Sequence, residues 1–153
     1  MRTSPVTRVS TEVQFHQMLD IFEEAFEDTE NYGKATRPKA PYIQALLTNP
    51  DFIGLLSVDG QGNAAGALAA YVLRKFEQER SEIYIYDLGV RTRARKQGVA
   101  GSLIEELKEL ARQMGASSIF VQADKGAEDY PAQQLYRKLG SEADVFHYDL
   151  KLD

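Results

Sequence analysis

The segment from Ser81 to Met114 constrains the fold most, because a strand, a basic loop and a helix follow one another there without a break. Isoleucine and tyrosine alternate over residues 83–86, which is the period of a strand, and this strand is expected to span Ser81–Val90. A strong helical pattern follows over Gly98–Met114, and Gly115 ends that helix. A chain built around this segment is expected to be a mixed α/β protein.

The rest of the chain provides strands and helices on both sides of this segment. Thr11 and Gln14 form the pattern of a capping box, which opens an amphipathic helix that runs to about Phe26. The order β-α-α-β-β-β-α-β-α-β predicts a mixed sheet of the α+β kind: an antiparallel meander, then a strand–helix–strand crossover with a parallel pair. The other expected elements are the strands Pro5–Val9, Phe52–Val58, Ala64–Phe76, Ser117–Asp124 and Val145–Leu152, the helices Pro41–Leu47 and Ala132–Leu139, and a loop at Glu27–Ala40.

Composition limits the kinds of partner and the compartment. The 153 residues are expected to form one domain over 1–153, and their net charge of −5 argues against nucleic acid as a functional partner and suits a cationic substrate. No apolar run approaches the roughly 18 residues of a membrane span, and Met1–Ser10 lacks the apolar segment of a signal peptide. The chain has no cysteine, and His16 and His147 lack metal-ligand spacing. We expect a soluble, cytoplasmic protein that uses no metal and no membrane.

The loop between the strand and the helix carries four basic residues within six positions: Arg91, Arg93, Arg95 and Lys96. The first N–H groups of a helix lack intrahelical partners, and the helix dipole is positive there, so such a turn can bind an anion. Gly98 would let the backbone approach a phosphate because it has no Cβ. The residue types alone fit a solvated basic loop equally well.

The spacing Arg95-x-x-Gly98-x-Ala100 favours the anion site, because it resembles the R/Q-x-x-G-x-G/A motif of the GNAT acetyltransferases, which also follows a strand and opens a helix. The resemblance implies the GNAT fold and acetyl-CoA as cosubstrate. It implies that Leu88 and Val90 offer backbone groups to the pantetheine and thioester, and that the strands ending near Val90 and Asp124 splay apart around the acetyl group. The pyrophosphate would be held by the turn that contains Arg95, through backbone amides of Gln97, Gly98, Val99, Ala100, Gly101 and Ser102.

The segment Ala132-x-x-Leu135-Tyr136-x-x-x-Gly140 resembles a second GNAT signature, A-x-x-L-Y-x-x-x-G. Coenzyme A leaves as a thiolate when an amine attacks the thioester. A phenol with a pKa of about 10 can protonate a thiolate whose conjugate acid has a pKa of about 8.5, if the two are held close in a dry site. Tyr136 is therefore the candidate general acid, and packing on the core is its alternative role.

The attacking amine must lose a proton, so a general base is expected, directly or through water. Asp87 immediately precedes Leu88 and is the preferred base, while Glu82 is a substrate ligand or the alternative base. Strict alternation would place Asp87 on the face of Ile83 and Ile85 and Glu82 on the other face. A β-bulge, which is common here in GNAT proteins, would change that facing.

The stretch Gly66–Val90 closely resembles the gentamicin 3-N-acetyltransferases of type I, as do shorter stretches at 121–124, 135–140 and 146–149. The likeness implies acetylation of the 3-amino group of 2-deoxystreptamine aminoglycosides such as gentamicin, hence antibiotic resistance, with a homodimer as a family-level expectation. The loop Lys125–Pro131 is longer than in that family, which leaves the range of drugs open. A polycationic drug needs anionic and polar ligands, and those expected are Glu82, Tyr84, Asp87, Asp124, Glu128 and Asp129.

Two other functions also fit the sequence. The acceptor could instead be a polyamine, another small amine, or a lysine or N-terminal amine of a protein. The chain could also bind acetyl-CoA without catalysis, as a sensor or structural unit, although the presence of both Asp87 and Tyr136 argues against this.

Overall fold

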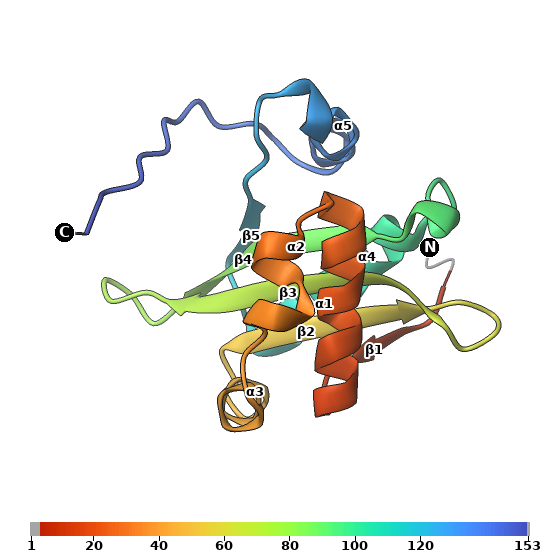
Figure 1. The fold of residues 1–153 in the computed structure, drawn as a ribbon. Helices are drawn as coiled ribbons and strands as arrows, with labels where there is room; N and C mark the ends of the chain where they lie inside the picture. The colour runs from red at the N-terminus through yellow and green to blue at the C-terminus, as the bar shows by residue number, and fades with distance from the viewer. Residues whose placement is uncertain (1–3, 153) are drawn as a thin grey trace. The chain divides into compact units, whose positions relative to one another are not determined.

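Residues 4–152 are described by a computed structural model, and their contacts divide them into two compact units after Val121. The first unit holds a five-stranded sheet in the order β1-β2-β3-β4-β5. Its strands are β1 (Val6–Arg8), β2 (Phe52–Val58), β3 (Ala64–Arg74), β4 (Ser81–Val90) and β5 (Ser118–Val121). Neighbours are antiparallel except β4 and β5, which are parallel, so the expected meander with one parallel pair is confirmed (Figure 1).

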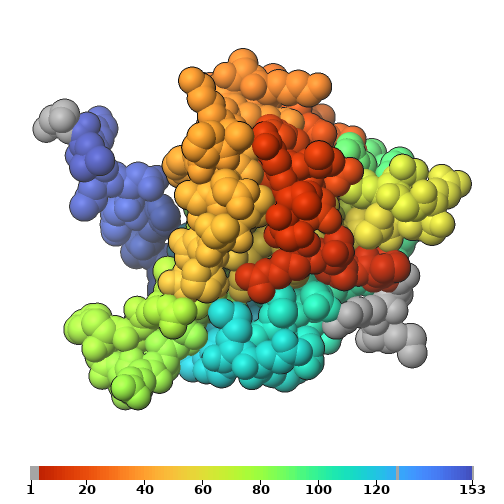
Figure 2. Space-filling view, turned by 90° about the horizontal axis from the view of Figure 1, so that it is seen from below, coloured from red at the N-terminus to blue at the C-terminus, as the bar shows by residue number. Residues whose placement is uncertain are grey.

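Helices cover both faces of this sheet. On one face lies α1 (Glu12–Phe26), which begins at the expected capping box, together with α2 (Thr29–Tyr32) and α3 (Ala40–Leu47). On the opposite face lies α4 (Val99–Met114). Figure 2 shows this layering, with α1 and α3 in red and orange on one side of the sheet and α4 in cyan on the other. Among residues 4–152, no helix is both long and apolar enough to span a bilayer.

Glycines near the paired ends of β3 and β4 let both helices approach closely. A Cβ at Gly66 of β3 would lie 2.5 Å from Cγ1 of Val99 in α4. A Cβ at Gly89 of β4 would lie 3.0 Å from the Cβ of Ala25 in α1. Close-packed interiors do not accommodate such an overlap without a shift of the helix. The two glycines therefore set how closely α4 and α1 lie against the ends of β3 and β4.

The parallel pair separates partway along β4. Residues 82–85 pair with 118–121, and β4 then continues to Val90. Within the described chain, no strand pairs with this side of β4 beyond Ile85. The expected parting of the two strands is confirmed, and it leaves this edge of β4 over residues 86–90 without a neighbouring strand among the described residues.

The segment expected to be a loop, Glu27–Ala40, is partly helical. It contains α2 and a 3₁₀ turn, η1 (Lys34–Thr36), and α3 begins at its last residue. Asp28 caps α2, because its carboxylate accepts the N–H of Asn31 at 3.0 Å. A helix of four residues is too short for apolar periodicity to reveal. Apart from the strand expected over Val145–Leu152, the other expected boundaries differ from the observed ones by at most three residues.

The second unit contains η3 (Ala127–Asp129) and α5 (Tyr130–Leu139). The final strand expected over Val145–Leu152 is not formed, since residues 141–152 belong to no helix or strand. A strand needs a hydrogen-bonded neighbour, and the described residues of this unit contain no other strand. The alternation of Phe146, Tyr148 and Leu150 therefore leaves these side chains exposed.

Candidate active site

The turn after β4 has the geometry of an anion-binding helix start. The chain passes from Val90 through a 3₁₀ turn, η2 (Thr92–Ala94), and α4 begins at Val99. Gly98 is the N-cap, with a φ of 79° in the left-handed region that favours glycine. The first N–H groups of a helix have no intrahelical acceptor, and a Cβ at Gly101 would meet no atom within 4 Å. The turn thus presents open backbone and the positive end of the α4 dipole.

Glu24 of α1 binds the first two residues of this turn. Its Oε1 lies 2.8 Å from Nη1 of Arg91, and its Oε2 accepts the N–H of Thr92 at 2.9 Å. The Thr92 N–H, and to a lesser extent the Arg91 guanidinium, lower the pKa of Glu24. This carboxylate stays charged at neutral pH and fixes η2 to α1.

Among the described residues, one of the other basic residues of the turn forms an ion pair and two form none. Arg93 Nη1 lies 3.0 Å from Oδ2 of Asp59 in the β2–β3 turn. Arg95 and Lys96 are exposed, and neither forms an ion pair with any residue between 4 and 152. Two cations are therefore available to an anionic ligand at the start of α4.

The remaining residues expected at the cofactor differ in how they face this turn. Val99 is buried against β3. Ser102 is buried as well, and both its N–H and its hydroxyl donate to the carbonyl of Gly98, at 3.0 and 3.1 Å. Ala100 and Gly101 are half-buried, and the Gln97 amide donates to the carbonyl of Arg93 at 3.2 Å. Leu88 and Val90 are half-buried on β4.

The β-bulge expected in β4 is present and lies at Tyr86. Ile85 is opposite Ala70 on β3 and Asp87 is opposite Ala69, so Tyr86 is the extra residue. Opposed residues on neighbouring strands share a face, and Ala69 belongs to the core cluster beneath α1. The bulge therefore turns Asp87 to the α1 face, away from the face that strict alternation would give it.

Asp87 is partly buried and has one short hydrogen bond. The hydroxyl of Tyr32, at the end of α2, donates to its Oδ2 at 2.7 Å. Burial raises the pKa of Asp87, the Tyr32 hydrogen bond opposes that shift, and the charge of Asp28 adds to it, so the net direction is upward. A carboxylate with a raised pKa is a better proton acceptor than an exposed one.

Glu82 and Tyr84 lie on the same face as Asp87, because they oppose residues of β3 that share the face of Ala69. Glu82 is held by Arg80, whose Nη1 is 3.0 Å from its Oε1. The ring of Tyr84 stacks on Phe120 of β5 with 4.8 Å between centroids. Three of the expected acceptor-side residues are therefore brought to one face of β4.

The other expected residues belong to the second unit. Tyr136 lies in α5, as expected, and is half-buried. Asp124 and Glu128 are exposed. Asp129 shapes the loop before α5, because its Oδ2 accepts the N–H of Asp124 at 2.9 Å. Gln133 also ties this loop down, through its amide to the Asp124 carbonyl at 2.6 Å.

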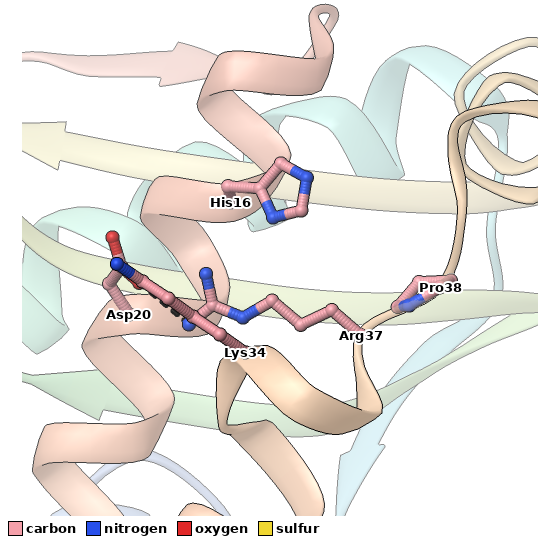
Figure 3. Close-up of a pocket in the computed structure, with 5 residues that line it drawn as sticks. All are labelled: His16, Asp20, Lys34, Arg37 and Pro38. Atoms are coloured by element: carbon pink, nitrogen blue, oxygen red, sulfur yellow. Dashed lines mark hydrogen bonds and ion pairs between the residues drawn. The ribbon is translucent and has the colours of Figure 1, made fainter.

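Two residues of this site come from the segment expected to be a loop. Tyr32 contacts Asp87, and Arg37 donates from Nε to the Tyr32 carbonyl at 3.1 Å. Figure 3 shows the Arg37 side chain extended toward Asp20 on α1, beside a hollow that is also lined by His16, Lys34 and Pro38. The Asp28–Asn31 spacing was the available signal for a capped turn here, but nothing in the sequence connects Tyr32 with Asp87.

In this mixed α/β protein a strand leads through a basic turn into a helix whose N-cap, Gly98, provides no side-chain hydrogen bond, beside a parallel pair that parts. A helix start of this kind is suited to an anionic group such as a phosphate. Residues 15–141 match the acetyltransferase (GNAT) family, and the chain belongs to that family.

Several solved structures are similar to this chain. An aminoglycoside acetyltransferase from an uncultured soil metagenomic sample is 48% identical over 97% of this chain and 98% of its own, with a TM-score of 0.93. A second one from such a sample, in complex with sisomicin, is 29% identical over 97% and 96% of the two chains, with a TM-score of 0.86. A ribosomal-protein-alanine N-acetyltransferase from Brucella melitensis shares the fold at 20% identity, with coverage of 97% and 98% and a TM-score of 0.74. None of the curated proteins matches the sequence.

Proposed function

We propose that this chain transfers the acetyl group of acetyl-CoA to the 3-amino group of 2-deoxystreptamine aminoglycosides such as gentamicin, and so confers resistance to them. The observation that carries the proposal is Asp87: a partly buried carboxylate with a raised pKa, one residue before Leu88, where β4 has parted from β5. The likeness to aminoglycoside acetyltransferases supports the class of acceptor. From the sequence we also propose the cytoplasm as its location and, as a family-level expectation, a homodimer as its assembly.

The residues of the turn fit the pyrophosphate of coenzyme A. Gly98 gives a left-handed N-cap, Gly101 leaves open space beside the helix start, and Arg95 and Lys96 supply charge that no described residue neutralises. When bound, acetyl-CoA supplies an activated acetyl thioester. Leu88 would orient it through backbone groups on the unpaired side of β4.

The chain's own residues would move two protons. Asp87 accepts a proton from the ammonium form of the substrate, which frees the nitrogen lone pair for the carbonyl carbon. As the C–N bond forms and the C–S bond breaks, Tyr136 donates its phenolic proton to the departing sulfur. The nitrogen loses its second proton as the amide forms, and that proton returns, directly or through water, to the Tyr136 phenolate. Each step matches the chemistry of its group, since Asp87 has a raised pKa and a phenol can protonate a thiolate held close to it.

The proposed acceptor is a polycation, and acidic groups of the chain would attract it. Glu82 and Tyr84 share the face of Asp87. In the second unit, Asp124 and Glu128 are exposed, and Asp129 keeps one oxygen outside its loop hydrogen bond. We propose these residues as the ligands of the ammonium groups.

Gly98→Val is expected to weaken the binding of acetyl-CoA sharply. The N-cap φ of 79° is strained for valine, and its side chain would occupy the surface at the start of α4. Gly115→Val is the matched control, because Gly115 has a φ of 71° at the other end of the same helix. Titration calorimetry should show a loss in the first variant only. Equal affinity in the two variants would exclude the turn as the coenzyme site.

The proposal is tested by thiol release from acetyl-CoA with gentamicin, sisomicin, spermidine and a lysine peptide as separate acceptors. We expect turnover with the aminoglycosides and, by NMR of the product, a single acetyl group on the 3-amino nitrogen. Acetylation of gentamicin only at another amine removes the assignment of position. Turnover of spermidine or the peptide alone identifies a different acceptor. Tight binding of acetyl-CoA without turnover of any acceptor would indicate a non-catalytic protein.

A further inference from the structure

The hydroxyl of Tyr32 donates a hydrogen bond to Asp87 at the centre of the proposed chemistry, and it comes from 55 residues away in the sequence. The Tyr32 ring is fixed by aromatic packing, with centroids 5.8 Å from Phe22 and 5.6 Å from Phe26 on α1. Burial and the neighbouring Asp87 raise the pKa of Tyr32 far above its ordinary value, so the phenol keeps its proton throughout the working pH range. Tyr32 can therefore donate to Asp87 but cannot act as a base itself.

Arg37 fixes the backbone that carries Tyr32. Its side chain is only 6% exposed, and Nη2 lies 2.6 Å from Oδ1 of Asp20 and 3.8 Å from Oε1 of Glu23 on α1. From the same guanidinium, Nε donates to the carbonyl of Tyr32 at 3.1 Å. A planar guanidinium with two acceptors on different elements ties them in one geometry, which an ammonium would not do as well. The dashed line in Figure 3 marks the contact between Arg37 and Asp20.

We propose that Tyr32 is a positioning residue for the Asp87 base: its hydroxyl orients the carboxylate and favours its ionised form, and Arg37 holds Tyr32 in place by tying its carbonyl to α1. The inference rests on the proposed role of Asp87 as base. It adds a chain of contacts, α1 to Arg37 to Tyr32 to Asp87, that sets the geometry of that base from outside the sheet.

Groups from three elements face Asp87. Tyr32 comes from α2 and Asp28 from its N-cap, Tyr71 comes from β3, and Tyr84 comes from β4. The ring of Tyr86, also on β4, packs against those of Tyr71 and Tyr84. Of the influences on Asp87, burial and Asp28 raise its pKa, and the Tyr32 hydrogen bond lowers it. Removal of that hydrogen bond must therefore raise the pKa of Asp87 further, and the base would stay protonated, hence inactive, up to a higher pH.

Tyr32→Phe tests this directly, because phenylalanine keeps the packing against α1 and removes only the hydroxyl. The acidic limb of kcat/KM against pH is expected to move to higher pH, with KM for acetyl-CoA unchanged. Tyr148→Phe removes the hydroxyl of an exposed tyrosine in the second unit and should leave the profile as it is. Arg37→Met should move the limb in the same direction as Tyr32→Phe, because the Tyr32 carbonyl loses its anchor.

A second readout does not depend on catalysis. Carbon NMR of the Asp87 side-chain carboxyl, titrated in the absence of any acceptor, should show a higher pKa in Tyr32→Phe than in the wild type. An equal or lower pKa in a folded Tyr32→Phe variant overturns the inference. If the NMR shift is seen but the wild type acetylates no aminoglycoside, the contact between Tyr32 and Asp87 stands and the proposed function fails.

Discussion

Asp87→Asn is expected to lower kcat with an aminoglycoside acceptor by roughly 10²–10⁴-fold, the usual range for loss of a general base. Asparagine keeps the size of the side chain and can still accept the Tyr32 hydrogen bond, but it cannot take a proton. If Asp87 only attracts the cationic drug, KM should rise while kcat stays nearly intact. In the Asp87→Asn variant the rate should also climb with pH, because the free amine then forms without help.

Glu82→Gln is the matched control for this variant. Glu82 lies on the same face of β4 but is held by Arg80, and it is the alternative base. If Asp87 is the base, Glu82→Gln should affect KM for the drug more than kcat. A large loss of kcat in Glu82→Gln together with near-normal kcat in Asp87→Asn would reverse the two roles.

Measurements of unfolding distinguish loss of the base in Asp87→Asn from damage to the fold. The pKa of Asp87 is raised in the folded protein. Its contribution to the free energy of unfolding is therefore fully present below the unfolded pKa of about 3.9, and it is lost as the pH rises through the folded pKa. An asparagine side chain at this position does not titrate. Relative to the wild type, Asp87→Asn should therefore gain stability as the pH rises from about 4 toward neutrality. Thermal or urea unfolding at the two pH values measures this, and a variant that is both inactive and less stable at neutral pH would point to misfolding.

The parts of the fold that depend on neighbours in the sequence could be predicted from it. The start of α1 follows from Thr11 and Gln14, which lie three residues apart and form the capping box as expected. The turn that opens α4 at Gly98 also lies within a few residues, so the motif and its geometry agree. The sequence left two possibilities for the side of the sheet on which Asp87 lies. One extra residue at Tyr86 reverses the alternation, and the alternating pattern does not reveal that residue.

Contacts between distant residues could not be predicted. Tyr32 reaches Asp87 only because α1, α2 and β4 pack together, and a four-residue helix gives no apolar period. The prediction of a final strand was wrong for a different reason. Residues 145–152 have a clear strand period, but alternation describes how a segment would pair and cannot supply the neighbouring strand, and none is present among the described residues of that unit. A periodic pattern predicts an element only where a partner for it exists.

Tyr136→Phe is expected to lower kcat by about 10²-fold, at the lower end of the range for loss of a general acid, and to change KM for acetyl-CoA much less. The ring of Tyr136 is half-buried on α5, and phenylalanine preserves it, so any effect on the fold should be small. Without the phenol, sulfur must leave as a thiolate or take its proton from water. Tyr130→Phe removes the hydroxyl of an exposed tyrosine at the start of the same helix and serves as the control. The measurement is single-turnover acetyl transfer, in which chemistry and not product release limits the rate. A wild-type rate in Tyr136→Phe under those conditions would leave Tyr136 as a packing residue of α5, and the departing thiolate would then need no proton from the chain.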